Sequence, residues 1–393
     1  MIKHRWVAAA VISSFFCSHS LSSQPARNAA SHRTTCVSTT FVQPPPAYAA
    51  AAAKARDLVC AQFLPDLPGL QISVAVNGRL IWSAGFGYAD RERGQTVDRT
   101  TMFQIGSISK TLTGDAVALL VEAHKLDLDL PIQRYVPSFP EKRWPITARQ
   151  LTGHRSGIRH YHRDGHAENY TTTHYPTVLS SLVMFAADSL EFEPGTRFGY
   201  STYGYTLLSA ALESASGEDF LTLMDTRVFR PLGMLHTAPD QIDSVMIDRA
   251  QKYDRDETTF RIFPAPRVDN SYKWAGGGFL SSAEDLVRFG SAHLAPGHLQ
   301  SASLDLLFTP QRIRDGNPAR INRAGSGYGV GWVIGRDARG RRIVRNDGGA
   351  IGGTAELFVD RDTKVVIAYC ANVNSVAGRP LRVMAAMTPI LDP

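Results

Sequence analysis

Cysteines are scarce in this sequence. Four occur in 393 residues, and Cys17 directly follows an apolar N-terminal stretch. The remaining three are Cys36, Cys60 and Cys370. Three cysteines without metal-ligand spacing exclude a scaffold held together by several disulfides, and they give no sign of a zinc site. In an oxidising compartment, two of these three cysteines could form one disulfide.

Long apolar runs and clustered charge are also missing. After the N-terminal stretch, no segment reaches about 18 apolar residues, the length at which a membrane span is expected. The net charge is +6, but the 42 basic residues are scattered along the chain. A nucleic-acid partner needs a clustered basic face, so we expect none. A content of 44% hydrophobic and 20% charged residues excludes fibrous and wholly disordered proteins.

The N-terminus has the pattern of an export signal. Basic residues at 3–5 precede an apolar run over 6–16, and small residues continue to Ser22. This predicts an exported protein, periplasmic or secreted, with no stable membrane span after processing; an uncleaved membrane tether is the alternative. The expected organisation is a signal peptide over 1–22, a linker rich in Ser, Ala and Pro over 23–54, and one domain over 55–393.

Local patterns predict helices and strands in a definite order. Alternating apolar residues predict a hairpin over 72–86, because Asn77-Gly78 supplies the positive φ angles of a two-residue type I′ turn. Helical periodicity predicts helices over about 49–63 and 107–126. Further short helices are expected at 147–153, 176–188, 202–216 and 218–230. Late strands are expected at 329–334, 342–345, 356–359 and 364–370, followed by a helix from about 376.

This order predicts the fold class. Strands at both chain ends and helices between them are typical of an α+β fold, in which both ends build one antiparallel sheet flanked by helices. A mainly helical insertion is expected over about 146–270. The sequence shows no alternation of strand and helix, which argues against a doubly wound α/β-hydrolase.

The feature that points to chemistry is Ser107-Ile108-Ser109-Lys110. Three residues apart on the expected helix, Ser107 and Lys110 share one face, with Cβ atoms roughly 5–6 Å apart. A serine hydroxyl is a weak nucleophile that needs a base within hydrogen-bond reach. A lysine can be that base if burial or neighbouring charges lower its pKa. A helix start also places the Ser107 N–H near a developing oxyanion. The motif arises by chance on exposed helix faces, but no other of the eight lysines has a serine three residues before it.

The surroundings of this motif resemble a known family. Residues 102–114, MFQIGSISKTLTG, are similar to the nucleophile segment of class C β-lactamases and related penicillin-binding-type serine hydrolases. Segments 146–158 and 194–201 continue the likeness in the family's order. Within the family, the likeness is greatest to the mitochondrial serine β-lactamase-like group and its bacterial relatives. The segments that carry this are 156–161, 200–205 and 269–281, and the whole resemblance spans about 60–375.

The resemblance implies a β-lactamase/transpeptidase-like fold and a serine hydrolase that forms an acyl-enzyme without metal or organic cofactor. Ser107 would be the acylated nucleophile, and Lys110 the general base or its electrostatic partner. Tyr200 would share proton transfer to the serine and the leaving group. Because nearby positive charge favours a phenolate, we expect Tyr200 to be poised as a base. The substrate would be a small molecule or peptide, and the oligomeric state stays open.

The resemblance also implies a group that binds the oxyanion and the substrate, made up of Gly349, Asn346, Gly348 and Thr202. Gly349 would give the second oxyanion N–H. Asn346 and Asp347 depart from the family pattern of Lys/His followed by Thr/Ser, and Thr202 replaces the asparagine of class C enzymes. Strand alternation points Arg345 to the face opposite Asn346, so it cannot substitute for the missing cation. We therefore expect weak binding of anionic β-lactams rather than loss of acylation.

Three alternatives remain. The segment from His160 to His166 comes within one residue of a metallo-hydrolase signature, although histidine clusters are often polar loops. A non-catalytic scaffold on the same fold is supported only by the altered Asn346-Asp347 pair. Among enzymes, a β-lactamase-like carboxylesterase competes with a peptidase, and one shared mechanism serves both.

Overall fold

A computed structural model describes residues 36–62, 67–162, 166–256, 258–259, 261–319, 321 and 325–374. The expected signal peptide, the first part of the expected linker and the helix expected from about 376 lie outside these residues. Within the described part of the chain, no helix is both long and apolar enough to cross a membrane.

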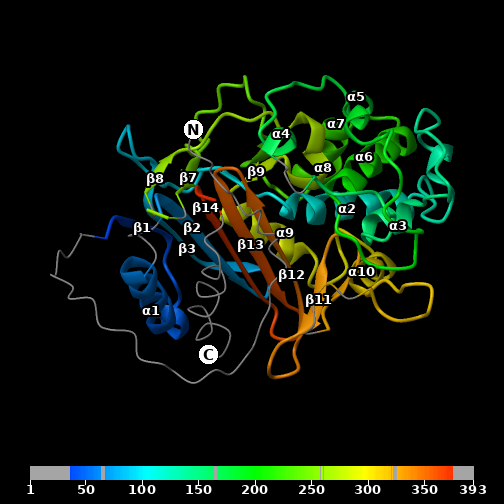
Figure 1. Ribbon diagram of the computed structural model, residues 1–393. Coiled ribbons are helices and arrows are strands. Elements are labelled where there is room, and N and C mark those ends of the chain that lie inside the picture. Colours follow the sequence, from blue (N-terminus) through cyan, green and yellow to red (C-terminus); the bar gives the residue numbers. More distant parts are fainter. Residues whose placement is uncertain are drawn as a thin grey trace, which may run out of the picture.

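A nine-stranded sheet forms the centre of the molecule (Figure 1). Its strands are β1 (Ser38–Val42), β2 (Gly69–Val76), β3 (Arg79–Asp90), β4 (Gln95–Thr96), β10 (Gly327–Tyr328), β11 (Val333–Arg336), β12 (Arg342–Ala350), β13 (Gly353–Asp360) and β14 (Val365–Ala371). The order is β1-β3-β2-β14-β13-β12-β11-β10, with β4 beside β3. All these pairings are antiparallel, and β2 pairs with β14. The expectation that both chain ends build one antiparallel sheet is therefore confirmed.

The predicted hairpin is present as β2 and β3. Asn77 and Gly78 occupy its turn with φ angles of 52° and 77°. Positive φ at both central residues is what a type I′ turn requires.

Helices gather on one side of the sheet, as the right half of Figure 1 shows. They are α2 (Ile108–Glu122), α3 (Ala148–Thr152), α4 (His166–Asn169), α5 (Val178–Ser181), α6 (Thr202–Ser216), α7 (Phe220–Met224), α8 (Trp274–Gly277), α9 (Ala283–Ala292) and α10 (Ser301–Phe308). Short 3-10 turns lie at Ile132–Arg134, Leu182–Met184 and Ser271–Lys273, and a π turn at Asp225–Phe229. Small strands complete this part: β5 (Phe103–Gln104), β6 (Thr237–Pro239), β7 (Tyr253–Arg255), β8 (Ile262–Pro264) and β9 (Phe279–Ser281).

Two apolar cores lie against the two faces of the sheet. On one face, α1 (Pro46–Gln62) buries Ala55 and Val59 against strand residues such as Ile72. On the other, α9 packs so closely that a Cβ on Gly290 would come within 2.7 Å of Val366. Removing this apolar surface from water is the main force holding the layers together.

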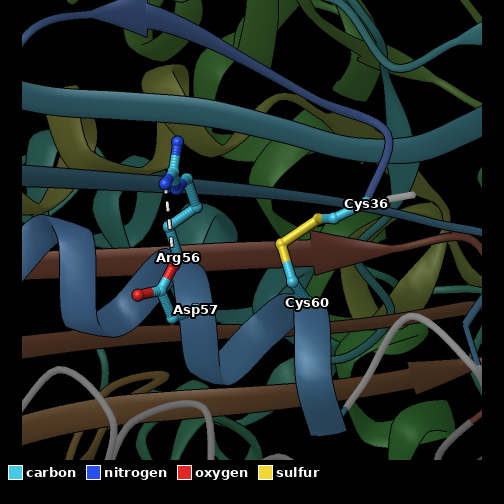
Figure 2. Close-up of a disulfide and its surroundings, with 4 residues drawn as sticks. All are labelled: Cys36, Arg56, Asp57 and Cys60. Atoms are coloured by element: carbon cyan, nitrogen blue, oxygen red, sulfur yellow. Dashed lines mark ion pairs between the residues drawn. A yellow bond between two sulfur atoms is a disulfide. The ribbon is translucent and has the colours of Figure 1, made fainter. Parts of the chain in front are cut away.

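The segment expected to be a linker is partly built into the domain, which corrects that prediction. Ser38–Val42 pairs with β3 as an edge strand, because this β-branched run finds a free strand edge beside it. A disulfide between Cys36 and Cys60 ties the chain before β1 to α1 (Figure 2). An exposed ion pair of 3.6 Å joins Arg56 to Asp57 on the same helix.

The strand expected at 329–334 is also corrected. Two short strands, β10 and β11, stand there instead, because Gly331 has a φ of +80° and breaks the extended run. A Cβ on Gly331 would come within 2.5 Å of the Lys110 carbonyl oxygen, so this turn presses against α2. Positive φ and close approach both favour glycine here.

Candidate active site

Ser107 directly precedes α2. Gly106 before it has a φ of +49°, and a Cβ there would lie 2.6 Å from the carbonyl oxygen of Gly349. Only glycine fits this approach of the loop to β12. Ser107 occupies the N-cap position of α2 without a side-chain capping hydrogen bond, and it is half-buried. The serine therefore stands at the N-terminal end of the helix, against the edge of the sheet.

The side chains of Ser107, Lys110 and Tyr200, all predicted from the sequence, come together in the structure. The Tyr200 hydroxyl donates to Ser107 Oγ at 2.6 Å. Lys110 Nζ lies 3.2 Å from the same oxygen. Tyr200 belongs to a segment 93 residues away along the chain, so the tertiary fold brings it to the pair. The helices α2, α6 and α8 that supply and surround these groups lie side by side (Figure 1).

Lys110 is wholly buried and surrounded by oxygen atoms. Its Nζ lies 3.1 Å from Thr202 Oγ1 and also bonds the carbonyl oxygen of Gly276. Burial, and secondarily the positive charge of Lys273, holds the pKa of Lys110 well below its usual range. The low pKa gives the amine the lone pair that a general base needs. The hydroxyl of Thr202, which was expected to bind substrate, contacts Lys110.

Two histidines that the sequence did not single out for this role position Tyr200. The Ser201 N–H donates to His154 Nδ1 at 3.1 Å, and the Thr202 N–H donates to His160 Nδ1 at 3.2 Å. Burial lowers the pKa of His154 well below its usual range and that of His160 to about 3. Both rings are therefore neutral acceptors at the start of α6. The His154 ring also lies 4.3 Å from that of Tyr200, measured between centroids.

The expectation that Tyr200 is poised as a phenolate is wrong. Desolvation raises its pKa above the ordinary value, and the negative charge of Asp347 adds to this. The hydrogen bond with Ser107 acts in the other direction but does not prevail. Tyr200 is thus a protonated phenol that donates to the serine. Lys110 Nζ lies 4.8 Å from the centroid of the Tyr200 ring.

Asn346 is turned toward α2 and does not face outward. Its Nδ2 donates to Thr111 Oγ1 at 2.8 Å, to the Gly331 carbonyl at 3.0 Å and to the Ser107 carbonyl at 3.3 Å. The side chain is 5% exposed. These contacts make Asn346 a link between β12 and the nucleophile helix, in contrast to the substrate-facing position expected from the family.

Gly348 and Gly349 have different environments. A Cβ on Gly348 would lie 1.8 Å from the Ile105 carbonyl oxygen and 2.9 Å from the Ser107 nitrogen, so this glycine permits close packing. A Cβ on Gly349 would meet open space. Because β11 pairs only with residues 342–345 of β12, the edge from 346 onward lies against the start of α2. Gly349 is thus the exposed backbone position beside the serine.

Strand alternation correctly separates Arg345 from Asn346. Arg345 shares its face with Asp347, and their charged groups are 3.6 Å apart. Arg345 also lies 3.7 Å from Glu356, whose pKa burial raises to about 7. The Asp347 side chain is 57% exposed and carries a negative charge on the Tyr200 side of the site.

The described part of the chain contains no group of three or more His, Cys, Asp or Glu side chains placed to hold a metal. Residues 163–165 of the candidate metal motif lie outside the described residues. His160 contacts the Thr202 N–H through Nδ1, as described above, and this use is part of the serine site.

Lys273 is a further residue of this region to which the sequence assigned no role. It is 6% exposed, and its positive charge acts on both Lys110 and His160. The available signal was the rarity of lysine, combined with its place in the segment 269–281 that resembles the family.

Comparisons with known proteins show the family and the fold of this chain. The family model described as Beta-lactamase matches residues 60–385. The human mitochondrial serine beta-lactamase-like protein LACTB is 33% identical over 386 residues, covering 76% of this chain and 70% of that protein. An octameric penicillin-binding protein homologue from Pyrococcus abyssi has a TM-score of 0.73 at 25% identity, covering 86% of this chain and 77% of its own. A class C beta-lactamase has a TM-score of 0.71 at 18% identity, and the match covers 88% of this chain and 97% of that one. The β-lactamase/transpeptidase-like fold is therefore confirmed.

Proposed function

Because this chain belongs to the beta-lactamase family of serine hydrolases, we propose that it is an exported enzyme that cleaves amide or ester bonds through an acyl-enzyme on Ser107. The observation that carries the proposal is the position of Ser107 Oγ, 2.6 Å from the Tyr200 hydroxyl and 3.2 Å from the nitrogen of a lysine with a lowered pKa. A nucleophile, a base and a proton donor are thus within hydrogen-bond reach of one another.

A neutral amine can satisfy the hydrogen-bond partners of Lys110. The Gly276 carbonyl can only accept a hydrogen bond, and Thr202 Oγ1 accepts another. A neutral amine has two N–H groups for these two oxygens, which leaves its lone pair for the Ser107 hydroxyl. Because Tyr200 already donates to Ser107 Oγ, the serine's own proton is free to point at the lysine.

The acylation step follows from this arrangement. Ser107 Oγ forms a bond with the substrate carbonyl carbon while its proton passes to Lys110 Nζ. The carbonyl oxygen becomes an oxyanion, for which the N–H groups of Ser107 and Gly349 are the candidate donors. When the intermediate collapses, the leaving nitrogen or oxygen takes the Tyr200 proton, and Tyr200 recovers a proton from Lys110.

Deacylation repeats the same transfers with water. A water molecule gives its proton to the neutral lysine and attacks the acyl carbon. The bond to Ser107 Oγ then breaks, and the serine recovers a proton through Tyr200 or Lys110. The two steps together consume only the substrate and one water molecule.

The disulfide supports export. Structural disulfides form and persist in oxidising compartments and are rare in a reducing cytosol. The bond between Cys36 and Cys60 follows directly after the expected signal peptide and linker start, and it ties β1 to the domain. This agrees with the basic and apolar pattern over residues 3–16.

A substrate panel tests the proposal. Purified protein is assayed with chromogenic esters, β-lactams and short peptide amides, alongside Ser107→Ala and the matched control Ser214→Ala on the exposed side of α6. We expect turnover of at least one class by wild type and by the control, and its loss in folded Ser107→Ala. Activity of Ser107→Ala equal to wild type would refute the proposal. The class that is turned over distinguishes an esterase from a peptidase, and inactivity on all classes would favour the scaffold.

A further inference from the structure

The side chain of Lys273 and the nucleophile loop both lie near Gly277 of α8. Lys273 is the last residue of the 3-10 turn Ser271–Lys273 and directly precedes α8. A Cβ on Gly277 would lie 3.8 Å from Lys273 Cδ and 3.8 Å from the backbone carbon of Gly106. Lys273 and the residue before Ser107 therefore flank the same glycine.

The ammonium group of Lys273 has no acidic partner among the residues that the structure describes. It lies near two aromatic rings, 5.1 Å from the Tyr272 ring centroid and 5.9 Å from the Tyr161 ring centroid. Asp240 is the acid that attracts it electrostatically. That carboxylate is already bonded by Lys252 and lies 3.3 Å from Arg249. The surroundings of Lys273 therefore hold more positive than negative charge.

Lys273 nevertheless remains a cation over most of the neutral range. Burial, followed by the charge of Lys252, lowers its pKa to about 8. A charged group that is 6% exposed and lacks a counter-ion is costly to maintain, so a buried cation is normally paired. An incoming anion would supply the missing partner.

We propose that Lys273 binds a carboxylate of the substrate close to the scissile bond, and that the enzyme therefore prefers acidic substrates. This inference rests on the proposed function, because it assigns the substrate class of the same site. Asn346 cannot take this role, since its Nδ2 is committed to Thr111, Gly331 and Ser107. On this proposal, Lys273 at the start of α8 provides the positive charge that the Asn346-Asp347 pair on β12 lacks.

A competing role for Lys273 would act only through Lys110. Its charge contributes to the low pKa of Lys110, so removing it should raise that pKa. Such an effect would move the acid limb of the pH–rate profile to higher pH for every substrate alike. Binding of a carboxylate instead changes the ratio between an acidic substrate and its neutral analogue, measured on the pH plateau.

The experiment uses matched pairs of 4-nitrophenyl esters. Succinates, glutarates and adipates are prepared with the distal end as a free carboxylate or as its methyl ester. Wild type, Lys273→Met and Lys273→Gln are compared with Lys125→Met, which removes an exposed lysine. A hydrogen bond to a charged group corresponds to a 10- to 100-fold effect. We expect the acid-to-ester ratio of kcat/KM to fall by about that factor in both Lys273 variants and to stay unchanged in Lys125→Met.

An equal loss on both members of each pair, or no preference for the acid at any chain length, would overturn the inference. Calorimetric titration of Ser107→Ala with the intact acidic esters adds a readout without turnover. Binding of the acid that disappears in Ser107→Ala/Lys273→Met supports the carboxylate site even if hydrolysis is absent. Absent hydrolysis would count against the proposed function. Equal binding of the acid and its methyl ester would count against a carboxylate site at Lys273.

Discussion

Replacing Lys110 by methionine tests whether the lysine acts as a base. Methionine keeps an unbranched side chain in the wholly buried position but has no lone pair comparable to the amine's. Lys110 Nζ lies 3.2 Å from Ser107 Oγ, a distance suited to direct proton transfer. A positioned general base contributes about 10²–10⁴-fold to the rate, or about 3–5 kcal/mol in the barrier. We expect acylation by Lys110→Met to slow by that factor.

The pH dependence of the acylation rate distinguishes a neutral lysine acting as a base from a charged lysine. If the neutral amine is the active form, acylation rises as pH increases through the Lys110 pKa and then reaches a plateau. Since burial holds that pKa well below its usual range, the rise should come at lower pH than for an exposed lysine. If the lysine worked as a charged electrostatic partner, acylation would instead fall through the same pKa.

Stopped-flow measurement of acylation by a chromogenic ester between pH 4 and 9 provides the assay, and circular dichroism shows whether each variant is folded. The acid limb should vanish in Lys110→Met because the titrating group is gone. A folded Lys110→Met that loses less than tenfold, or that keeps the wild-type acid limb, would refute the assignment.

Three other predictions concern the same framework. Tyr200→Phe should slow turnover steeply, and its combination with Lys110→Met should cost far less than the product of the two losses, because both belong to one proton-transfer unit; multiplicative losses in kcat/KM would contradict this. Asn346→Asp should lower the free energy of unfolding by about 1–3 kcal/mol, since a carboxylate cannot donate to the Ser107 and Gly331 carbonyls; urea unfolding beside the exposed control Asp347→Asn measures it, and equal midpoints would show it wrong. Replacing Cys36 and Cys60 together by serine should cost about 3 kcal/mol, given their separation of 24 residues; a urea midpoint unchanged from the oxidised wild type would oppose that estimate.

Local patterns were sufficient to place Ser107 and Lys110 on one helix face and to predict the hairpin, whereas the catalytic assignment of the pair also needed the resemblance of its surroundings to a family. Residues three apart on a helix share a face whatever the rest of the chain does, and Asn-Gly fixes its own turn. Tyr200 needed the likeness of its loop to a family, because no local rule connects positions 93 residues apart.

The features that the sequence did not reveal depend on tertiary contacts. Alternation placed Arg345 and Asn346 on opposite faces, but only the packing of β12 on α2 decides that Asn346 points inward. The protonation of Tyr200 depends on desolvation and on Asp347, which no spacing predicts. Lys273 lacks a partner because Lys252 and Arg249 occupy Asp240, and that pairing exists only in the folded chain.

The most direct test of the account is the site of the covalent acyl group. Protein quenched in acid during turnover of a slowly hydrolysed ester or β-lactam is digested with trypsin, which cuts after Arg99 and Lys110. The account predicts that peptide 100–110 gains the mass of the acyl group and that fragment ions place it on Ser107. Acylation of Ser109, whose buried Oγ accepts the Phe279 N–H at 3.3 Å, or of a residue outside this peptide would contradict it.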